Sequence, residues 1–389
     1  MIFHYGLNRA VKIIDSLRSY QTVYPIRVNT MITTQEKLLE TLNEKNIPAT
    51  PHPELDNCIL VAVEGPLEIN EKSKTVKVLY NKPVHNILIG ASLGARDFVP
   101  VSEEIAIGDD LTIVNELGEP IANGILMMGL KDILEKKRGI AVKVTEYKYQ
   151  IPNLKVLKEF LRGQFIHQNI PSFLVGSQIK LKPKDRVLDM NVGRGEILSQ
   201  IWQNNNQIWE NDKTPDKKNS PVIIALESSN KLTERLGENI KRLRMNKPFF
   251  DLKQFSLQKF TERFNKEETF DWIILNLPSS NIGLRPKLYG HIREKALVDF
   301  ARLQRNYLIH AAKLLKPGGT ILYLTNSLDP SENEDNIQYA VETLELKLVK
   351  CDFNLGSNDI DSFQGSEHLQ YFYPDVHNTD GQFLAKLTK

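Results

Sequence analysis

The stretch from Phe270 to Gly283, FDWIILNLPSSNIG, joins an apolar run to polar residues that could contact a ligand. The apolar run is typical of a buried parallel strand, and the proline and serines after it are typical of a loop. In an open α/β sheet, ligands bind beyond the carboxyl ends of the strands. We therefore expect Asn276, Pro278, Ser279 and Ser280 to line a pocket.

A second candidate is the bend Asp189-Met-Asn-Val-Gly193-Arg-Gly195, which lies between an expected strand and an expected helix. Glycines at such a bend let the backbone approach a ligand, and the first amides of the helix face the same spot. The spacing D-x-x-x-G-x-G fits the S-adenosylmethionine loop of class I methyltransferases better than the dinucleotide pattern G-x-G-x-x-G, because the third glycine is missing. Asp189, Gly193 and Gly195 are therefore expected to bind a cofactor, with Asn276 beside them.

Glu227 follows the next apolar run, where an acid can accept hydrogen bonds from both hydroxyls of a ribose. The alternative is an acid that only stabilises the next helix through the helix dipole. Because the glycine loop is in register, ribose binding is the favoured interpretation. The helix after Ser229 has a basic face that includes Lys231 and Arg242. This face could meet phosphate, although such faces are more often simply solvated.

From Lys182 onward, apolar strands alternate with helices, which predicts a Rossmann-like, doubly wound and mostly parallel sheet. The expected strands are residues 186–190, 222–226, 272–276, 320–325, 346–353 and 383–387, with a further one near 249–255. Residues 203–221 are polar and rich in asparagine and lysine. They are predicted to form a flexible surface insertion.

Upstream of this sheet, the pattern predicts two smaller units. Residues 1–74 have the pattern of an α+β segment, with a helix capped by a threonine near residue 34 and a strand at 59–63. Residues 75–150 contain short β-rich runs separated by glycine turns, as in a small barrel. The runs are residues 76–80, 87–90, 97–101, 111–115 and 141–147. Residues 151–389 are assigned to the sheet domain, beginning with a helical stripe at 154–161.

The barrel segment, from the run ILIGAS to the run GILMM, resembles a PUA domain, an RNA-binding pseudo-barrel. The resemblance rests on a strand entering Gly90, on the Gly108-Asp109 turn, and on Gly124 in the strand that follows. Each of these features is common, so another small barrel is the alternative interpretation.

Composition sets limits on the kind of protein. The chain has 389 residues, of which 41% are hydrophobic and 25% charged, so it is ordinary globular material with length for two or three domains. The formal net charge is only +2, so any nucleic-acid surface must come from local clusters. The two cysteines, Cys58 and Cys351, lie too far apart in the sequence for a zinc motif and suit a reducing compartment. That cysteine spacing also leads us to expect no metal site. Because no apolar run is long enough for a membrane span, we expect a cytoplasmic protein.

From Gly163 onward, the sequence resembles the Nol/Nop/Sun (Sun/Fmu) family of S-adenosylmethionine-dependent RNA cytosine-5 methyltransferases. The matching runs are FIHQNIPSFLVGS, KPKDRVLDM, FDWIILNLPSSNIGLRP, LLKPGG, YLTNSLDPSENE and HNTDGQFLAKL. The upstream RVNT at 27–30 and the PUA-like insertion are similar to those of the PUA-containing, tRNA-directed branch. The resemblance thus covers nearly the whole chain.

The sequence departs from the family at the positions of its chemistry. Similar members carry Asp-Ala-Pro-Cys-Ser-Gly and Ser-Thr-Cys-Ser, whereas this chain has Asn276-Leu-Pro-Ser279 and Leu324-Thr-Asn326-Ser327. Methylation of cytosine carbon 5 requires a nucleophile to add at carbon 6, and a thiolate can do this near neutral pH. A serine hydroxyl is far less acidic, and an amide is not a nucleophile. Ser279, Asn326 and Asn276 are therefore degenerate catalytic positions, and cytosine-5 methylation is expected to be lost or impaired.

The resemblance then implies a tRNA-binding protein that has kept the fold. The barrel would hold the CCA end and acceptor stem, while Lys231, Arg242, Arg285 and Lys287 contact phosphates. One alternative is an active tRNA methyltransferase that acts on cytosine carbon 5 or, less well supported, on an exocyclic amine. Another is a non-catalytic partner of an active homologous methyltransferase. S-adenosylmethionine is a possible cofactor in each case.

Overall fold

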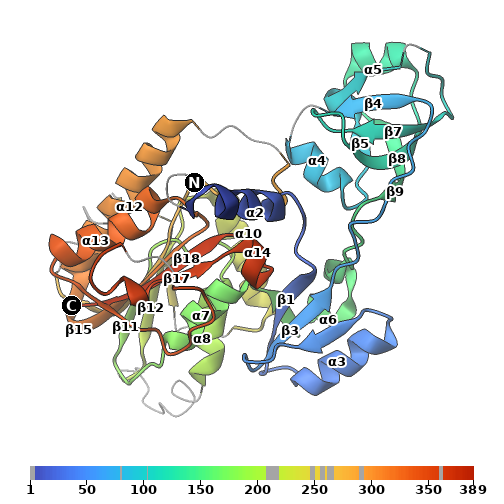
Figure 1. Cartoon of the computed structure of the whole chain (residues 1–389). Coiled ribbons are helices and arrows are strands. Elements are labelled where there is room, and N and C mark those ends of the chain that lie inside the picture. Colours follow the sequence, from blue (N-terminus) through green and yellow to red (C-terminus); the bar gives the residue numbers. More distant parts are fainter. Residues whose placement is uncertain are drawn as a thin grey trace.

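The computed structural model describes residues 5–78, 81–102, 104–206, 219–245, 250–254, 259–260, 267–288, 293–358 and 362–389. Three sheets account for the strands in these ranges (Figure 1). The largest sheet lies in the C-terminal domain, and a four-stranded and a six-stranded sheet belong to the N-terminal half. Among the described helices, none combines the length and the apolar character that a bilayer crossing requires.

The large sheet has the strand order β13-β12-β11-β14-β15-β18-β16, with β17 also paired to β18. Its strands are β11 (Arg186–Asp189), β12 (Val222–Leu226), β13 (Phe250–Lys253), β14 (Phe270–Asn276), β15 (Leu315–Thr325), β16 (Lys347–Val349), β17 (Gln370–Phe372) and β18 (Gln382–Thr388). The strands from β13 to β15 are parallel, and β18 is antiparallel to β15. The doubly wound, mostly parallel sheet predicted from the sequence is confirmed. The strands at 186–189 and 222–226 lie where they were expected, and β17 was not predicted.

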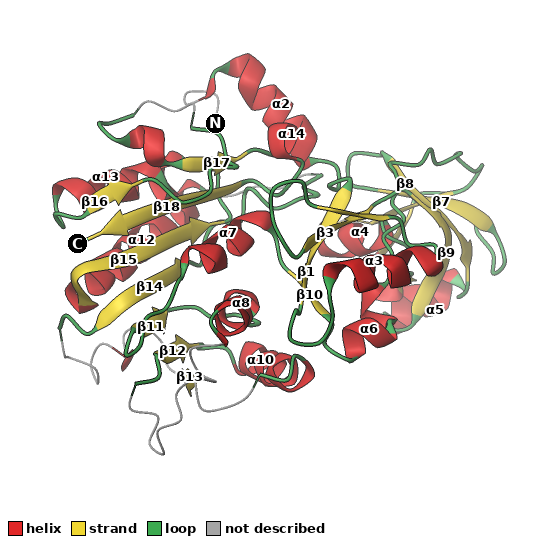
Figure 2. Ribbon diagram, turned by 90° about the horizontal axis from the view of Figure 1, so that it is seen from below, coloured by secondary structure: helices red, strands yellow, loops and turns green. Residues whose placement is uncertain are grey.

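Helices cover both faces of this sheet (Figure 2). On one face, α12 (Glu294–Leu314) and α13 (Glu334–Glu342) pack Leu308, Ala311 and Ile337 against the strands. On the other face lie α7 (Ile170–Gln178), α8 (Glu196–Asn204) and α10 (Asn230–Arg242). The alternation of buried residues along β14, with Ile273 facing one layer and Ile274 the other, explains why the strand is apolar throughout. The remaining short helices here are α2 (Leu7–Leu17), η3 (Pro330–Glu332), η4 (Ser366–His368) and α14 (Pro374–His377).

The N-terminal module is a four-stranded sheet in the order β10-β1-β3-β2, with α3 against it. Its elements are β1 (Val23–Val28), α3 (Gln35–Glu44), β2 (Ala49–Pro51), β3 (Cys58–Ala62), η2 (Leu154–Val156), α6 (Lys158–Leu161) and β10 (Phe165–His167). The cap predicted for α3 is present, because the Thr34 hydroxyl accepts a hydrogen bond from the Lys37 N–H. Residues 165–167, assigned from the sequence to the C-terminal domain, thus add a strand to the N-terminal sheet. The stripe at 154–161 is split between η2 and α6.

The six-stranded sheet is inserted between β3 and β10 and forms the expected barrel-like unit. Its elements are β4 (Thr75–Val78), α4 (Asn81–Ile87), β5 (Leu93–Gly94), η1 (Ala95–Asp97), β6 (Phe98–Pro100), β7 (Asp110–Val114), β8 (Pro120–Leu126), α5 (Leu130–Lys136) and β9 (Ile140–Tyr147). The strand predicted at 87–90 is wrong. These residues form the last turn of α4 and the turn after it, where Ile87 and Leu88 are buried as helix-end side chains in the barrel core.

Two buried polar residues fasten the N-terminal module to the C-terminal domain. Arg27 donates hydrogen bonds to Gln168 Oε1 at 2.7 Å and to Ser199 Oγ at 2.6 Å. Asn29 donates through Nδ2 to the carbonyls of Gly163 at 3.0 Å and Leu243 at 3.1 Å. Both residues are almost fully buried, so these bonds replace the water that the side chains give up. The module is therefore held close to α8 and to the glycine loop in front of it.

Candidate functional site

The carboxyl ends of four adjacent strands bring the predicted site residues to one edge of the large sheet. Asp189 ends β11, Glu227 follows β12, Asn276 ends β14, and Asn326 follows β15. The bends after these strands are bonded to one another: Asn191 Nδ2 donates to the Asn276 carbonyl at 2.7 Å. This edge is where a parallel sheet binds ligands. Phe255, at the expected end of the third strand, lies outside the described residues, as do residues 207–218 of the expected insertion.

The glycine loop has the backbone conformation that its glycines permit. Gly193 has φ of 58° and Gly195 has φ of 84°, in the left-handed region that favours glycine. Gly195 also starts α8, and a Cβ there would lie 2.5 Å from Leu236 Cδ1. The loop therefore depends on Gly193 for its backbone turn, and on Gly195 for both its backbone turn and its packing against Leu236.

Glu227 is buried and holds the glycine loop. Its Oε2 accepts the Gly193 N–H at 3.1 Å, and its Oε1 accepts the Ser229 N–H at 2.8 Å. A carboxylate has about four acceptor sites, so each oxygen keeps a lone pair for another donor. Glu227 thus shapes the loop and keeps acceptor capacity on both carboxylate oxygens.

Asp189 is a buried carboxyl beside this loop. Burial raises the pKa of Asp189 to about 7, with Glu227 and Glu196 adding to the effect and the Asn191 N–H, 3.2 Å from Oδ1, opposing it. The carboxyl is therefore near its titration point at neutral pH. A bound cation close to Asp189 would favour its ionised form.

The two positions of the missing cysteines meet at this edge. Ser279 is 3% exposed, and its Oγ accepts the Asn326 N–H at 3.3 Å and donates to Asn281 Oδ1 at 3.4 Å. The Asn326 side chain accepts a hydrogen bond from Gln382 Nε2 at 2.5 Å. Among the described residues, neither partner of the Ser279 hydroxyl is a base. The described partners of the hydroxyl are therefore a backbone amide and a side-chain amide.

A buried carboxylate supports the loop that contains Ser279. Glu332 is fully buried and accepts the Ser280 N–H at 2.9 Å and the Ser327 hydroxyl at 2.6 Å. Gln304 Nε2 donates to Glu332 Oε2 at 2.9 Å and to the Pro278 carbonyl at 3.0 Å. These residues were missed in the sequence analysis. Gln304 could have been noticed, because it falls on the buried stripe of α12 between Ala301 and Leu308.

The same loop is closed by a contact between two glycines. The Gly283 N–H donates to the Asn326 carbonyl at 3.2 Å, and the Gly381 N–H donates to the Gly283 carbonyl at 2.7 Å. A Cβ on Gly283 would lie 1.8 Å from the Gly381 carbonyl oxygen. Only a residue without a side chain fits here, so the backbone after Ser279 is fixed against the start of β18.

The predicted RNA-binding cations differ in how free they are. Lys231 lies on the exposed face of α10. Arg242 instead donates to the Phe160 and Phe165 carbonyls at 2.8 and 2.9 Å, and its guanidinium lies 3.9 Å from the Phe160 ring centroid. Burial lowers the pKa of Arg242 to about 10. Lys231 is thus exposed to solvent, whereas Arg242 joins α10 to the N-terminal module.

Arg285 and Lys287 also have partners within the protein. Arg285 donates to the carbonyls of Ser19 at 2.8 Å and Tyr20 at 3.0 Å. Lys287 Nζ donates to the Asn281 carbonyl at 2.7 Å. Burial lowers the pKa of both side chains. Each of them therefore positions the loop after β14, and a phosphate contact would have to be shared with these bonds.

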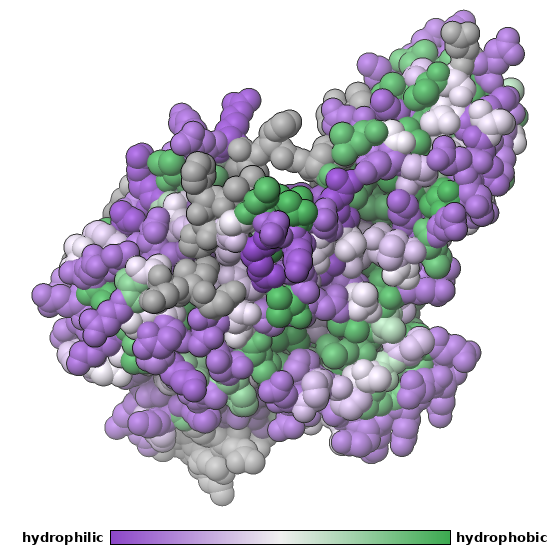
Figure 3. Space-filling view, in the orientation of Figure 1, coloured by the Kyte–Doolittle hydropathy of each residue, from purple (hydrophilic) through white to green (hydrophobic). Residues whose placement is uncertain are grey.

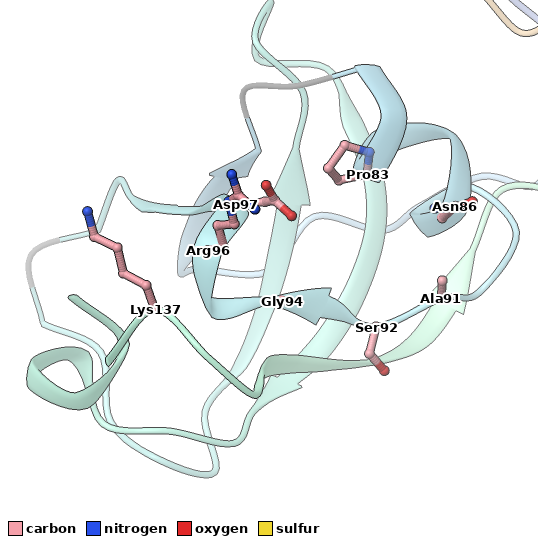
Figure 4. Close-up of a pocket in the computed structure, with 8 residues that line it drawn as sticks. All are labelled: Pro83, Asn86, Ala91, Ser92, Gly94, Arg96, Asp97 and Lys137. Carbon is pink, nitrogen blue, oxygen red and sulfur yellow. The ribbon is translucent and has the colours of Figure 1, made fainter. Parts of the chain in front are cut away.

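The barrel has a pocket of its own, with a volume of about 780 Å³ (Figure 4). Arg96, Asp97 and Lys137 line one side, with Asn86 and Ser92 farther along the wall. The other lining residues are Pro83, Ala91 and Gly94. Two cations and several hydrogen-bonding groups in an open cavity suit a polar, anionic ligand such as the end of an RNA strand.

Comparisons with known families match both large parts of the chain. Residues 178–388 match the family described as 16S rRNA methyltransferase RsmB/F, and residues 80–148 match the PUA domain. The chain is 32% identical to a tRNA (cytosine(72)-C(5))-methyltransferase of Pyrococcus horikoshii, over 99% of this chain and 94% of that protein. It is 26% identical to the mouse tRNA (cytosine(72)-C(5))-methyltransferase NSUN6, over 88% of this chain and 75% of that protein.

A similar solved structure is that of NSun6 from Pyrococcus horikoshii with SFG. It aligns with a TM-score of 0.84 and 30% identity, covering 100% of this chain and 96% of that chain. The similarity extends through the N-terminal module, the barrel and the large sheet, so the arrangement of all three units is shared.

Proposed function

The chain belongs to the RsmB/F family of S-adenosylmethionine-dependent RNA methyltransferases and has a PUA domain, and we propose that it is a tRNA-binding member with impaired cytosine-5 methylation. The observation that supports the impairment is the pair Ser279 and Asn326, which lie in contact where the family pattern has two cysteines. A hydroxyl without a base and an amide do not replace a thiolate that adds to carbon 6 of cytosine. Asn276 can donate a hydrogen bond to the ring but cannot supply the charge of an aspartate.

The proposed RNA ligand is tRNA, because the similar Pyrococcus and mouse proteins are named as tRNA methyltransferases. In this proposal the barrel pocket beside Arg96 and Lys137 takes the CCA end of the acceptor stem. Lys231 contacts a phosphate from the exposed face of α10. The target nucleotide would then lie against the loop of Ser279.

The cofactor groups fit S-adenosylmethionine. Glu227 would offer two acceptors to the ribose hydroxyls, Gly193 and Gly195 would allow close approach of the backbone, and Asp189 would supply a buried carboxyl to a cation. When bound, the cofactor would supply an electrophilic methyl group. The residues of this chain would bind and orient it, with Asn276 at the side that faces the target base.

Two measurements test the proposal. Binding of tRNA with and without its CCA end should differ in affinity and weaken steeply with salt, because phosphate contacts release counterions. Incubation with labelled S-adenosylmethionine and total tRNA should leave no methylcytosine above background. Equal, weak and salt-insensitive binding of both tRNAs would remove tRNA recognition from the proposal.

A second candidate is an active tRNA methyltransferase, which the preserved cofactor edge favours. Incorporation of label into tRNA, followed by identification of the modified nucleoside, would establish this candidate and distinguish cytosine carbon 5 from an exocyclic amine. A third candidate, a non-catalytic partner of an active homologue, would show incorporation only when the homologue is added.

A further inference from the structure

An aromatic cavity lies at the junction of the barrel and the N-terminal module, beside β1 and β10. Its volume is about 480 Å³, within the range of small-ligand pockets. The rings that line it are those of Tyr20, Tyr24, Phe160, Phe165 and His167. The other lining residues are Ile26, Ile89, Ile151, Pro152, Asn153, Leu154 and Lys155. Figure 3 shows hydrophobic residues gathered between the C-terminal domain on one side and the N-terminal module with the barrel on the other.

The centre of the cavity wall is a stacked pair of rings. Tyr24 and His167 have ring centroids 3.9 Å apart and planes inclined by 25°. Their positions are fixed by the pairing of β1 with β10, where Ile26 opposes His167. Because each ring already covers one face of the other, a planar group entering the cavity would extend an existing stack.

His167 has a hydrogen-bonding atom to spare. Its Nε2 is buried and has no hydrogen-bond partner among the described residues. Burial, together with the nearby charges of Arg194 and Lys155, lowers the pKa of His167 to about 3, so the imidazole is neutral. A neutral imidazole can donate to or accept from the edge of a heteroaromatic ring. A purely apolar ligand would leave this atom unpaired, which is costly in a buried site.

The charges around the cavity suit a nucleotide. Lys155 lines it, and the charge of Arg194 in the glycine loop acts on both Tyr24 and His167, although Arg194 also pairs with Glu196 at 2.9 Å. A smaller cavity of about 140 Å³ has four lining residues in common with it and adds Arg285 and Asp380 on the side of the Ser279 loop. The common residues are Tyr20, Tyr24, Ile151 and His167.

We infer that this junction cavity binds one unpaired base of the RNA, stacked on the Tyr24–His167 pair. The inference rests on the proposed function, because it assigns a second base-binding site to the same RNA. The junction cavity includes Ile89 of the barrel, and the smaller cavity beside it includes Arg285 of the loop after β14, so an RNA held at both ends could place a base here. Stacking on aromatic rings is how proteins hold splayed bases. The site would therefore fix the position of the RNA between its two ends.

The test compares Tyr24→Leu with Tyr24→Phe in the full chain. Loss of the ring in Tyr24→Leu should weaken tRNA binding about tenfold at fixed salt, while the slope with salt stays unchanged because no phosphate contact is lost. Tyr24→Phe keeps the ring and should bind as the wild type does. Tyr339→Leu, which changes a tyrosine on the outer helix α13, is the matched control. Urea unfolding of each variant shows that it is folded.

A small probe separates this inference from the proposed function. A 2-aminopurine ribonucleotide is titrated into the wild type with excess S-adenosylmethionine present, so that the cofactor site is filled. Stacking should quench its fluorescence, and Tyr24→Leu should require about tenfold more protein for the same quenching. Quenching by a wild type that fails to bind tRNA would support the cavity and overturn the proposed function. If folded Tyr24→Leu bound both tRNA and the probe as tightly as the wild type does, the cavity site alone would be overturned.

Discussion

The Ser279 hydroxyl oxygen accepts a hydrogen bond from the backbone N–H of Asn326, 3.3 Å away. The loop of Ser279 is held by the bond from the Ser280 N–H to Glu332 and by the backbone bonds of Gly283, so its shape does not depend on the side chain at 279. The scaffold that would place two thiols together is therefore present without the thiols. Restoring the family's residues at positions 276, 279 and 326 would show whether these side chains alone limit methylation while the fold is kept.

The first prediction is a gain of methylation in the triple variant Asn276→Asp, Ser279→Cys, Asn326→Cys. A thiolate would supply the nucleophile and the aspartate the charge that stabilises the protonated ring. The double cysteine variant with Asn276 retained should be slower than the triple variant by about 10²–10⁴-fold. The measurement is label transferred from S-adenosylmethionine to tRNA. Equal label transfer by the wild type and the triple variant would show that the cysteines are not what the wild type lacks.

The second prediction concerns Asp189 and pH. Burial raises the pKa of this carboxyl to about 7 from an ordinary value of 3.8. Between these values the folded protein keeps a proton that the unfolded chain has released, so the contribution of Asp189 to stability falls as pH rises to about 7. Relative to Asp189→Asn, the wild type should lose about 3 kcal/mol between about pH 5 and pH 8.

Urea unfolding of both proteins at the two pH values measures this difference. The comparison with the variant is needed because His167 acts in the opposite direction. Burial lowers the pKa of His167 to about 3, so its contribution to stability is lost as pH falls below its ordinary value of 6.5. That effect is common to both proteins and cancels. A constant gap between wild type and Asp189→Asn at both pH values would contradict the prediction.

The third prediction separates two cations of α10. Lys231→Ala should leave stability unchanged and reduce the salt slope of tRNA binding by about one unit, as expected for one phosphate contact. Arg242→Ala should instead destabilise the fold by about 2–4 kcal/mol, because two carbonyls lose a charged donor and Phe160 loses its stacked guanidinium. Unfolding curves and binding at several salt concentrations distinguish them. A normal stability for Arg242→Ala would return it to the set of candidate RNA contacts.

The fourth prediction uses two glycines with opposite surroundings. Gly283→Ala should destabilise the protein by about 3 kcal/mol or more, because its Cβ would lie 1.8 Å from a backbone oxygen that cannot move freely. Gly237→Ala is the control: it lies inside α10 with no atom within 4 Å of the added Cβ. This change should stabilise the helix by about 0.5–1 kcal/mol. Unfolding free energies of similar size and sign for the two variants would argue against the close Gly283–Gly381 contact.

The sequence indicates the site edge well because its information is local. The four apolar runs that precede the site residues are strands, and the rule that ligands bind at the carboxyl ends places Asp189, Glu227, Asn276 and Asn326 together. The buried network could not be predicted in the same way. Glu332 follows a proline in a polar run, and its burial depends on donors from Gln304 and Ser280, which are distant in the sequence.

Pairing between distant strands was also beyond the sequence pattern. The run at 165–167 is apolar and short, and only its partner β1 decides that it belongs to the N-terminal sheet. The role of Arg242 depends in turn on that pairing, because it donates to the carbonyls of Phe160 in α6 and Phe165 in β10. Helical periodicity predicts which face of α10 carries Arg242, but it does not predict which carbonyls from distant parts of the sequence accept its hydrogen bonds.

Two segments of the chain connect the barrel to the N-terminal module, and these segments are hydrogen-bonded to each other. Glu64 and Gln150 exchange backbone hydrogen bonds at 3.1 and 2.9 Å, and the Leu67 N–H donates to the Lys148 carbonyl at 2.7 Å. A body held by a paired ribbon cannot swivel as one on a single linker can. The paired ribbon therefore limits how far the barrel pocket can move relative to the N-terminal module, and under the proposed function it would favour RNAs whose end and presented nucleotide lie at a matching distance.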